Sequence, residues 1–294
     1  AMKSKAPVHD VAPDNRVFNW SIGDEAATDA AFKNAAHVTK IDLVNNRLIP
    51  NAMEPRAAIG YYDTGADHYT LYTTSQNPHV ARLVISAFHG LAPEHKLRVI
   101  APDVGGGFGI RGELYPEDVL VCAAALRLRR PVKWIEDRRE HLIAANHSRQ
   151  QRHRIRAAID ERGHILAIDD QFIHDQGAYV RTHGGTVPDL AAAMLLGPYR
   201  IPNYRVAGHI RLTNKTPAGT YRAPGRFEST FVRERLMDAI AAKAGLSPLE
   251  VRRRNFISAA EMPYDRQVET LGTDVVFDSG DYAGLIDKTL ARIG

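Results

Sequence analysis

Short stretches in which apolar and polar residues alternate recur along this chain of 294 residues, and each predicts a β-strand. Most are rich in β-branched and aromatic residues, which favour strands. Two of them flank Glu161-Arg162-Gly163, whose glycine favours a tight turn, so we expect a hairpin there. The expected strands cover residues 37–48, 57–62, 68–74, 97–101, 132–135, 151–160, 165–173 and 204–212.

Other stretches have the composition and the start signals of α-helices. Asp24 or Thr28 can cap the first of them, and Ser247-Pro248-Leu249-Glu250 is a capping box that begins a later one. Proline stands near the start of two more, where its missing N–H costs nothing. The expected helices cover residues 22–36, 77–89, 116–129, 226–244 and 282–293, with a short one inside the loop-rich segment 181–203.

The expected helices and strands mix without strict alternation, which predicts an α+β fold with helices packed on mixed sheets. The chain is 44% hydrophobic and long enough for one large domain or two lobes. No apolar run approaches the ~18 residues that a membrane helix needs, and the N-terminus has no secretion signal. We therefore expect a cytoplasmic protein with no membrane partner.

The charge and the cysteine content of the chain argue against further kinds of partner and of metal site. The net charge is +4, but the basic runs are short and are not interleaved with aromatic residues, so we expect no nucleic-acid partner. Cys122 is the single cysteine, in an apolar helical run that favours a core position. One cysteine excludes an internal disulfide and a cysteine-rich zinc or iron–sulfur site in this chain.

The segment VIAPDVGGGFGIRGELYPEDV, residues 99–119, carries the strongest candidate chemistry. Its successive glycines expose backbone N–H groups without Cβ atoms in the way, and they accept positive φ angles. A loop of this kind near a helix N-terminus attracts anions and oxo groups. A structural turn without a ligand is the alternative.

Part of the same loop, Gly107-x-Gly109-x-x-Gly112, also matches the fingerprint of Rossmann-like dinucleotide-binding domains, and Glu136-Asp137 follows about 25 residues later. That fingerprint needs its last glycine in the first turn of the helix. Here Pro116 marks the expected helix start four residues later. Binding of a dinucleotide by residues 107–112 therefore stays an alternative, whereas a Walker A loop is excluded because no Gly-Lys-Ser/Thr follows.

Four other segments join the glycine loop, and they resemble the molybdenum-binding subunit of the molybdenum hydroxylases in order and spacing. This family includes xanthine dehydrogenase, aldehyde oxidase and the large subunit of carbon monoxide dehydrogenase. The segments are Met53-Glu54-Pro55-Arg56, Thr74-Ser75-Gln76-Asn77-Pro78, Ile201-Pro202-Asn203-Tyr204 and Gly219-Thr220-Tyr221-Arg222-Ala223-Pro224-Gly225-Arg226-Phe227-Glu228.

The resemblance implies a domain organisation. Residues 15–294 are expected to form the first molybdenum-cofactor-binding domain, without the second half of the molybdopterin-binding region. Residues 1–14 are expected to be the start of the expressed chain and a linker to this domain, with Ala1-Met2 as a cloning remnant.

The resemblance also implies a molybdopterin cofactor with molybdenum, in the cytosine dinucleotide form. Gln76 would hydrogen-bond an oxo ligand of the metal through its amide, and Phe108 would offer its backbone N–H to the apical oxo group. Arg222 would lie beside the metal and the pterin, so none of the three is a direct side-chain ligand. A polar residue before a helix is the simpler interpretation of Gln76. The glycines that let the pterin approach would be Gly106, Gly107 and Gly109.

In this family a C–H bond is oxidised with oxygen from water, and a glutamate acts as general base. That glutamate belongs to the C-terminal half of the family's sequence, and no GExx segment stands in an equivalent position here. We therefore expect no catalytic residue in this chain and no activity of the chain alone. The expected partners are the second half of the molybdenum subunit, an iron–sulfur subunit with 2Fe–2S clusters and an FAD subunit.

Departures from the family pattern narrow the small-molecule substrate. Ala223 stands where copper-type carbon monoxide dehydrogenases carry a cysteine, and thiolate is the ligand that Cu(I) prefers. Gly112 replaces the acid of purine-oxidising members, with Glu113 one residue later, and Pro224 replaces an aromatic residue. Glu113 and Pro224 are thus candidate substrate-pocket residues, and an aldehyde or a nitrogen heteroaromatic other than xanthine is expected. A non-catalytic scaffold of the same fold is the remaining alternative.

Overall fold

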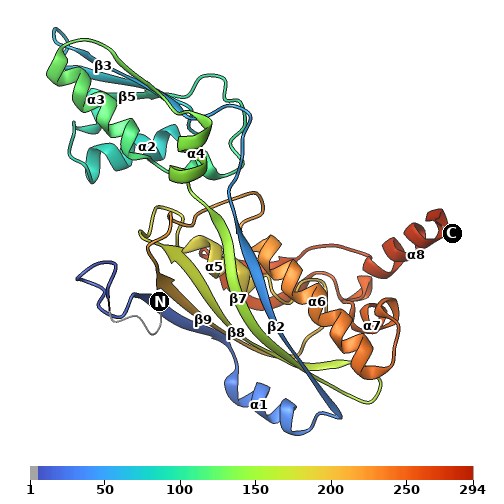
Figure 1. Cartoon of the computed structure of the whole chain (residues 1–294). Coiled ribbons are helices and arrows are strands. Elements are labelled where there is room, and N and C mark those ends of the chain that lie inside the picture. Colours follow the sequence, from blue (N-terminus) through green and yellow to red (C-terminus); the bar gives the residue numbers. More distant parts are fainter. Residues whose placement is uncertain (1–5, 294) are drawn as a thin grey trace.

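The computed structural model describes residues 6–293, which form two lobes (Figure 1). The large lobe contains a five-stranded sheet in the order β1-β9-β8-β7-β2, in which only β8 and β9 pair in parallel. Its strands are β1 (Arg16–Gly23), β2 (His37–Leu48), β7 (Ser148–Ile159), β8 (Ile165–Gly177) and β9 (Asn203–Leu212).

Helices cover both faces of this sheet because neighbouring strand residues point to opposite sides. On one face, Ile155 of β7 belongs to the main core with Leu236 and Met237 of α6 (Arg226–Ala244). On the other, the Arg156 guanidinium lies 4.2 Å from the centre of the Phe32 ring in α1 (Glu25–Lys33). The large lobe also contains α5 (Thr186–Ala193), α7 (Pro248–Asn255), the hairpin β10 (Tyr264–Thr270) and β11 (Thr273–Phe277), and α8 (Tyr282–Ile293).

The small lobe is an insertion between two paired strands. Leu48 at the end of β2 lies opposite Ser148 at the start of β7, and the chain between them forms a separate four-stranded sheet in the order β5-β4-β3-β6. This sheet has its own core, which includes Leu71, Ile85 and Cys122. The small lobe contains β3 (Ala57–Asp63), β4 (His68–Thr73), α2 (Pro78–Ala87), β5 (Leu97–Ile100), α3 (Pro116–Leu128), β6 (Val132–Ile135) and α4 (Arg138–Ala144).

The α+β fold with mixed sheets predicted from the sequence is confirmed, and so is the hairpin at Gly163, which has φ +84°. Asp24 is the cap of α1 and accepts a hydrogen bond from the N–H of Ala27, whereas Thr28 is buried inside the helix. The prediction that residues 22–36 are all helical is wrong, because residues 22 and 23 end β1 and α1 stops at Lys33. The strands and α-helices of residues 6–293 for which no prediction is made from the sequence are β1, α4, β10 and β11.

Residues 6–14 form turns fastened to the large lobe. The side chain of Asn15, which is buried, accepts a hydrogen bond from the N–H of Val8 at 2.7 Å, and His9 contacts the carbonyl of Ala178 at 2.6 Å. The expected remnant Ala1-Met2 lies outside the described residues. Within residues 6–293, no helix combines the length and the apolar character needed to cross a bilayer.

Candidate functional site

The glycine loop follows β5 and has an unusual backbone. Gly106 and Gly109 have φ angles of +100° and +97°, a region that glycine adopts without steric cost. Phe108 between them also has a positive φ, +54°, which is uncommon for an aromatic residue and marks local strain. The Phe108 side chain is 46% exposed, so the strained residue presents its ring at the surface rather than in the core.

Gln76, between β4 and α2, packs directly against this loop. Its Oε1 accepts a hydrogen bond from the N–H of Gly109 at 2.8 Å, and its own N–H donates to the carbonyl of Arg111 at 2.9 Å. A Cβ atom on Gly107 would lie 2.3 Å from the Gln76 Cδ, so this close approach requires glycine. Because Oε1 is engaged, the Nε2 amide group is the end of the side chain left to donate to a ligand.

Glu54 and Arg111 hold the other side of the loop. Glu54 Oε2 accepts a hydrogen bond from the N–H of Gly105 at 2.7 Å and pairs with the guanidinium of Arg111, which is 1% exposed. Arg111 also donates to the carbonyls of Glu54 and Pro55. Burial opposes ionisation of Glu54, but the bonds from Arg111 and Gly105 outweigh it and lower the pKa of this carboxyl. The loop is therefore fixed by a charged pair on its own lobe.

The segment 219–228 of the large lobe meets the glycine loop across the boundary between the lobes. The N–H of Arg222 donates to the carbonyl of Phe108 at 2.9 Å. A Cβ atom on Gly109 would lie 2.5 Å from Thr220 Cγ2, so the two segments are in close contact. The sequence motifs around Gln76, Phe108 and Arg222 therefore come together in space, although 146 residues separate the first from the last.

Arg149, which no sequence pattern singled out, lies in β7 and supports the segment 219–228. It is 2% exposed, and its guanidinium pairs with the buried Glu228 at 2.9 Å. It donates to the carbonyl of Arg222 at 2.8 Å and to that of Ala223 at 3.4 Å. Its guanidinium also lies 4.3 Å from the centre of the Phe227 ring. A single arginine in a strand carries no local signal for these contacts.

Glu113 and Pro224, the candidate substrate residues, have different surroundings. Glu113 is buried, and its Oε1 accepts a hydrogen bond from the N–H of His183 at 3.2 Å. Its Oε2 has no partner within residues 6–293. Pro224 is half-buried and precedes Gly225, which caps α6 with φ +72°. A substrate contact of either residue stays a prediction.

The Rossmann-like alternative does not fit the fold. Gly112 ends a short 3-10 turn, and α3 begins only at Pro116. The strand before the loop, β5, is at the edge of a mixed sheet, whereas dinucleotide-binding domains place it in the interior of a parallel sheet.

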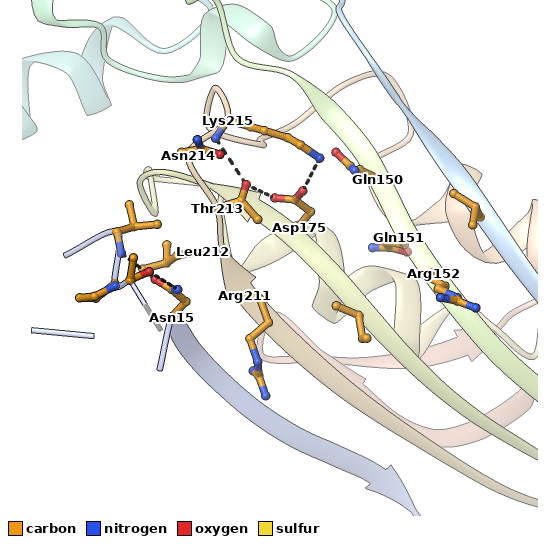
Figure 2. A pocket seen from close by; sticks show the side chains of 15 residues that line it. Asn15, Gln150, Gln151, Arg152, Asp175, Arg211, Leu212, Thr213, Asn214 and Lys215 are labelled. Carbon is orange, nitrogen blue, oxygen red and sulfur yellow. Dashed lines mark hydrogen bonds and ion pairs between the residues drawn. The ribbon is translucent and has the colours of Figure 1, made fainter. Parts of the chain in front are cut away.

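A groove of about 1150 Å³ lies at the end of the five-stranded sheet (Figure 2). Its central acid is Asp175, which accepts hydrogen bonds from Thr213 at 2.6 Å and Lys215 at 2.9 Å and pairs with Arg47 at 3.2 Å. Asp175 thus faces two cations, Arg47 and Lys215, and no residue predicted for the cofactor lines the groove. The candidate chemistry therefore belongs to the glycine loop.

Comparison with known proteins agrees with this assignment. The family model of the molybdopterin cofactor-binding domain matches residues 8–256. The chain belongs to this family. The resemblance to molybdenum hydroxylases seen in the sequence is thereby confirmed, since relatives of this cofactor-binding domain include a carbon monoxide dehydrogenase large chain and an aldehyde oxidoreductase.

Individual relatives of this molybdopterin cofactor-binding domain are longer than the chain. It is 41% identical over 262 residues to the 6-hydroxypseudooxynicotine dehydrogenase complex subunit gamma of Paenarthrobacter nicotinovorans, covering 89% of this chain and 33% of that subunit. It is 35% identical to the carbon monoxide dehydrogenase large chain of Hydrogenophaga pseudoflava, covering 95% and 34%. The crystal structure of quinoline 2-oxidoreductase from Pseudomonas putida 86 superposes with a TM-score of 0.90 at 33% identity, covering 99% and 37%. The chain thus spans about a third of the length of these relatives.

Proposed function

We propose that this chain forms one wall of the molybdenum-cofactor site of a molybdenum hydroxylase. The observation that supports this most directly is the meeting of Gln76, the glycine loop and Arg222 through the Gly109 N–H and the Phe108 carbonyl. The glycine loop suits a bulky anionic group, because Gly106 and Gly109 take positive φ angles and the N–H of Phe108 between them has no protein partner within residues 6–293. Residues 15–294 then form the first cofactor-binding domain.

Three groups of this chain would hold the cofactor. Gln76 Nε2 and the N–H of Phe108 have no protein partner within residues 6–293 and are the donors proposed to face oxo groups. The exposed guanidinium of Arg222 supplies positive charge for the anionic pterin. When bound, the molybdenum cofactor supplies the oxidising power and the site where oxygen from water is delivered. The chain's own part is to bind, orient and hydrogen-bond this group.

The substrate proposed for the whole protein is a nitrogen heteroaromatic, with an aldehyde as second candidate. Two relatives with 36% and 33% identity are named for nicotine and quinoline, both nitrogen heteroaromatics. Carbon monoxide is disfavoured because Ala223 offers no thiolate for copper. The one cysteine, Cys122, is buried in the small-lobe core, where burial raises the pKa of its thiol to about 12.

The remaining parts of the proposal rest on the family resemblance. They are the cytosine dinucleotide form of the cofactor, a general-base glutamate from the second half of the molybdenum subunit, separate 2Fe–2S and FAD subunits, and a cytoplasmic location. With these groups elsewhere, the chain alone is expected to be inactive.

Metal and pterin analysis tests the proposal. The protein is purified after co-expression with its neighbouring genes, and molybdenum is measured by elemental analysis and pterin by its fluorescence. About one molybdenum and one pterin per chain are expected. A folded complex that contains neither is the result expected of a non-catalytic scaffold and contradicts the proposal. Saturable binding of NADH to the chain would instead support the dinucleotide alternative.

A further inference from the structure

A pocket of about 310 Å³ lies between the first turns of α6, the turn after α5 and the β10–β11 hairpin. Its volume is at the lower end of the range typical of small-molecule sites, about 300–1,000 Å³. None of the residues assigned to the cofactor lines it. Its lining contains no acidic residue but three arginines, which are Arg226, Arg233 and Arg266.

Arg266 is a buried cation without a carboxylate. It is 7% exposed, and its guanidinium lies 5.1 Å from the centres of the Tyr264 and Phe277 rings. It donates to the carbonyl of Gly197, while its Nε has no partner within residues 6–293. Burial lowers the pKa of Arg266 to about 10, so the group stays charged at neutral pH. A buried charge of this kind costs free energy that an anion in the pocket would offset.

The other two arginines add charge from the same helix, α6. Arg233 is held in place by Glu234 at 3.0 Å and by the Thr230 hydroxyl at 3.1 Å. Glu234 also pairs with Arg252 at 3.0 Å, and Arg252 has a second partner in Asp238 at 3.0 Å, so two carboxylates offset the charges of Arg233 and Arg252. Arg226 is exposed at the start of the helix, and its guanidinium has no ion pair within the described part of the chain. The pocket therefore keeps a net positive charge.

We propose that this pocket binds the phosphate group of a small organic phosphomonoester. A phosphate has three terminal oxygens and accepts more hydrogen bonds than a carboxylate, which matches a pocket with the unpaired guanidinium of Arg226 and the partly free donors of Arg266. The rest of the lining is largely apolar, so an organic group attached to the phosphate has a surface to bury. The apolar lining residues include Ala193, Met194, Val275 and Phe277.

Titration calorimetry on the purified 294-residue chain tests this site with phenyl phosphate and inorganic phosphate as probes. Phenyl phosphate is expected to bind more tightly than inorganic phosphate because of the apolar wall. Arg226→Gln is expected to weaken phenyl phosphate binding at least about tenfold, since it removes a charge-assisted hydrogen bond. Arg226 is exposed and unpaired, so Arg226→Gln is expected to fold. Arg266 is buried, so the fold of Arg266→Gln is checked by circular dichroism before its binding is measured.

The matched control is Arg235→Gln, which removes an exposed arginine of the same helix that does not line the pocket. Its affinity for phenyl phosphate is expected to equal that of the wild type. No binding by the wild type, or equal binding by wild type and Arg226→Gln, overturns the proposal. Inorganic phosphate binding as tightly as phenyl phosphate identifies free phosphate as the ligand and overturns the organic part. Molybdenum content does not enter any of these measurements.

Discussion

The side-chain oxygen of Gln76 accepts a hydrogen bond from the backbone N–H of Gly109 at 2.8 Å, across 33 residues of sequence. This bond fixes which end of the amide is free, because the oxygen is engaged and the NH₂ group is left to donate. The same side chain covers Gly107 so closely that a Cβ atom there would lie 2.3 Å from Gln76 Cδ. The glycine and the glutamine therefore form one unit, and each can be tested separately.

Gly107→Val is expected to displace Gln76 and the loop and to remove most of the molybdenum from the complete enzyme. The loop is at the surface and away from both main cores, so the midpoint of thermal unfolding is expected to fall by no more than roughly 2–4 °C. Elemental analysis and a thermal scan measure the two effects. The control is Gly185→Ala, where an added Cβ meets nothing within 4 Å. Normal molybdenum content in Gly107→Val would count against the loop as a cofactor site.

Gln76→Ala is expected to lower turnover about 100–1,000-fold while most of the molybdenum stays bound, because one preorganised donor is lost but the backbone cradle remains. Gln76→Glu keeps an oxygen for the Gly109 N–H and replaces only the NH₂ donor, so a similar loss is expected. Steady-state kinetics with molybdenum content measured in parallel checks both variants. Wild-type turnover in Gln76→Glu would show that the amide donor has no role.

Local patterns predicted the parts of the fold that depend on local chemistry. The alternation of residues 37–48 and the composition of 226–244 gave strand and helix boundaries that the structure matches. The strands β10 and β11 were missed because they are short, polar in part and irregular in register between Asp265 and Glu269. Helix α4 did carry a start signal, since Asp137 and Glu140 form a capping box.

The candidate site, like the fold, was predicted from the sequence only in part. The resemblance singled out Gln76, Phe108 and Arg222 because each belongs to a recognisable segment, and the structure places these segments in contact, whereas their roles stay a prediction. The supporting pair of Arg149 and Glu228 was missed because 79 residues separate them and, although Glu228 ends the recognised segment 219–228, Arg149 has no local signal. Long-range charge pairs of this kind become visible only when the strands and helices are placed in space.

Arg149→Met is expected to destabilise the chain by about 3–5 kcal/mol, because it leaves Glu228 buried without its partner and two loop carbonyls without a donor. The free energy of unfolding in urea measures this effect. The control is Arg152→Met, which breaks a pair with Asp42 at the surface of the same strand and is expected to change the stability far less. Similar, small effects of both substitutions would contradict the supporting role of Arg149.

His174 makes the stability depend on pH. It is 1% exposed, its Nδ1 accepts a hydrogen bond from Gln151 at 3.2 Å, and its Nε2 has no partner within residues 6–293. Burial lowers the pKa of His174 to about 4, so the folded protein keeps this ring neutral. In the unfolded chain the same ring takes up a proton near pH 6.5. Its contribution is therefore fully present above pH 6.5 and is lost as the pH falls toward 4.

Replacement of His174 by asparagine isolates this contribution, because the asparagine oxygen accepts the bond from Gln151 but does not titrate. Between pH 7 and pH 4 the wild type is expected to lose roughly 3 kcal/mol more of its unfolding free energy than His174→Asn does. Urea unfolding at a series of pH values measures the difference. The matched control is His79→Asn, which removes an exposed histidine and is expected to follow the wild-type curve, since no buried side chain is changed. Protonation of buried carboxylates at low pH destabilises all three proteins equally. Only the difference between their curves of unfolding free energy against pH therefore reports on His174. Parallel curves for wild type and His174→Asn would mean that the ring is protonated in the folded state, with a partner for its Nε2 proton.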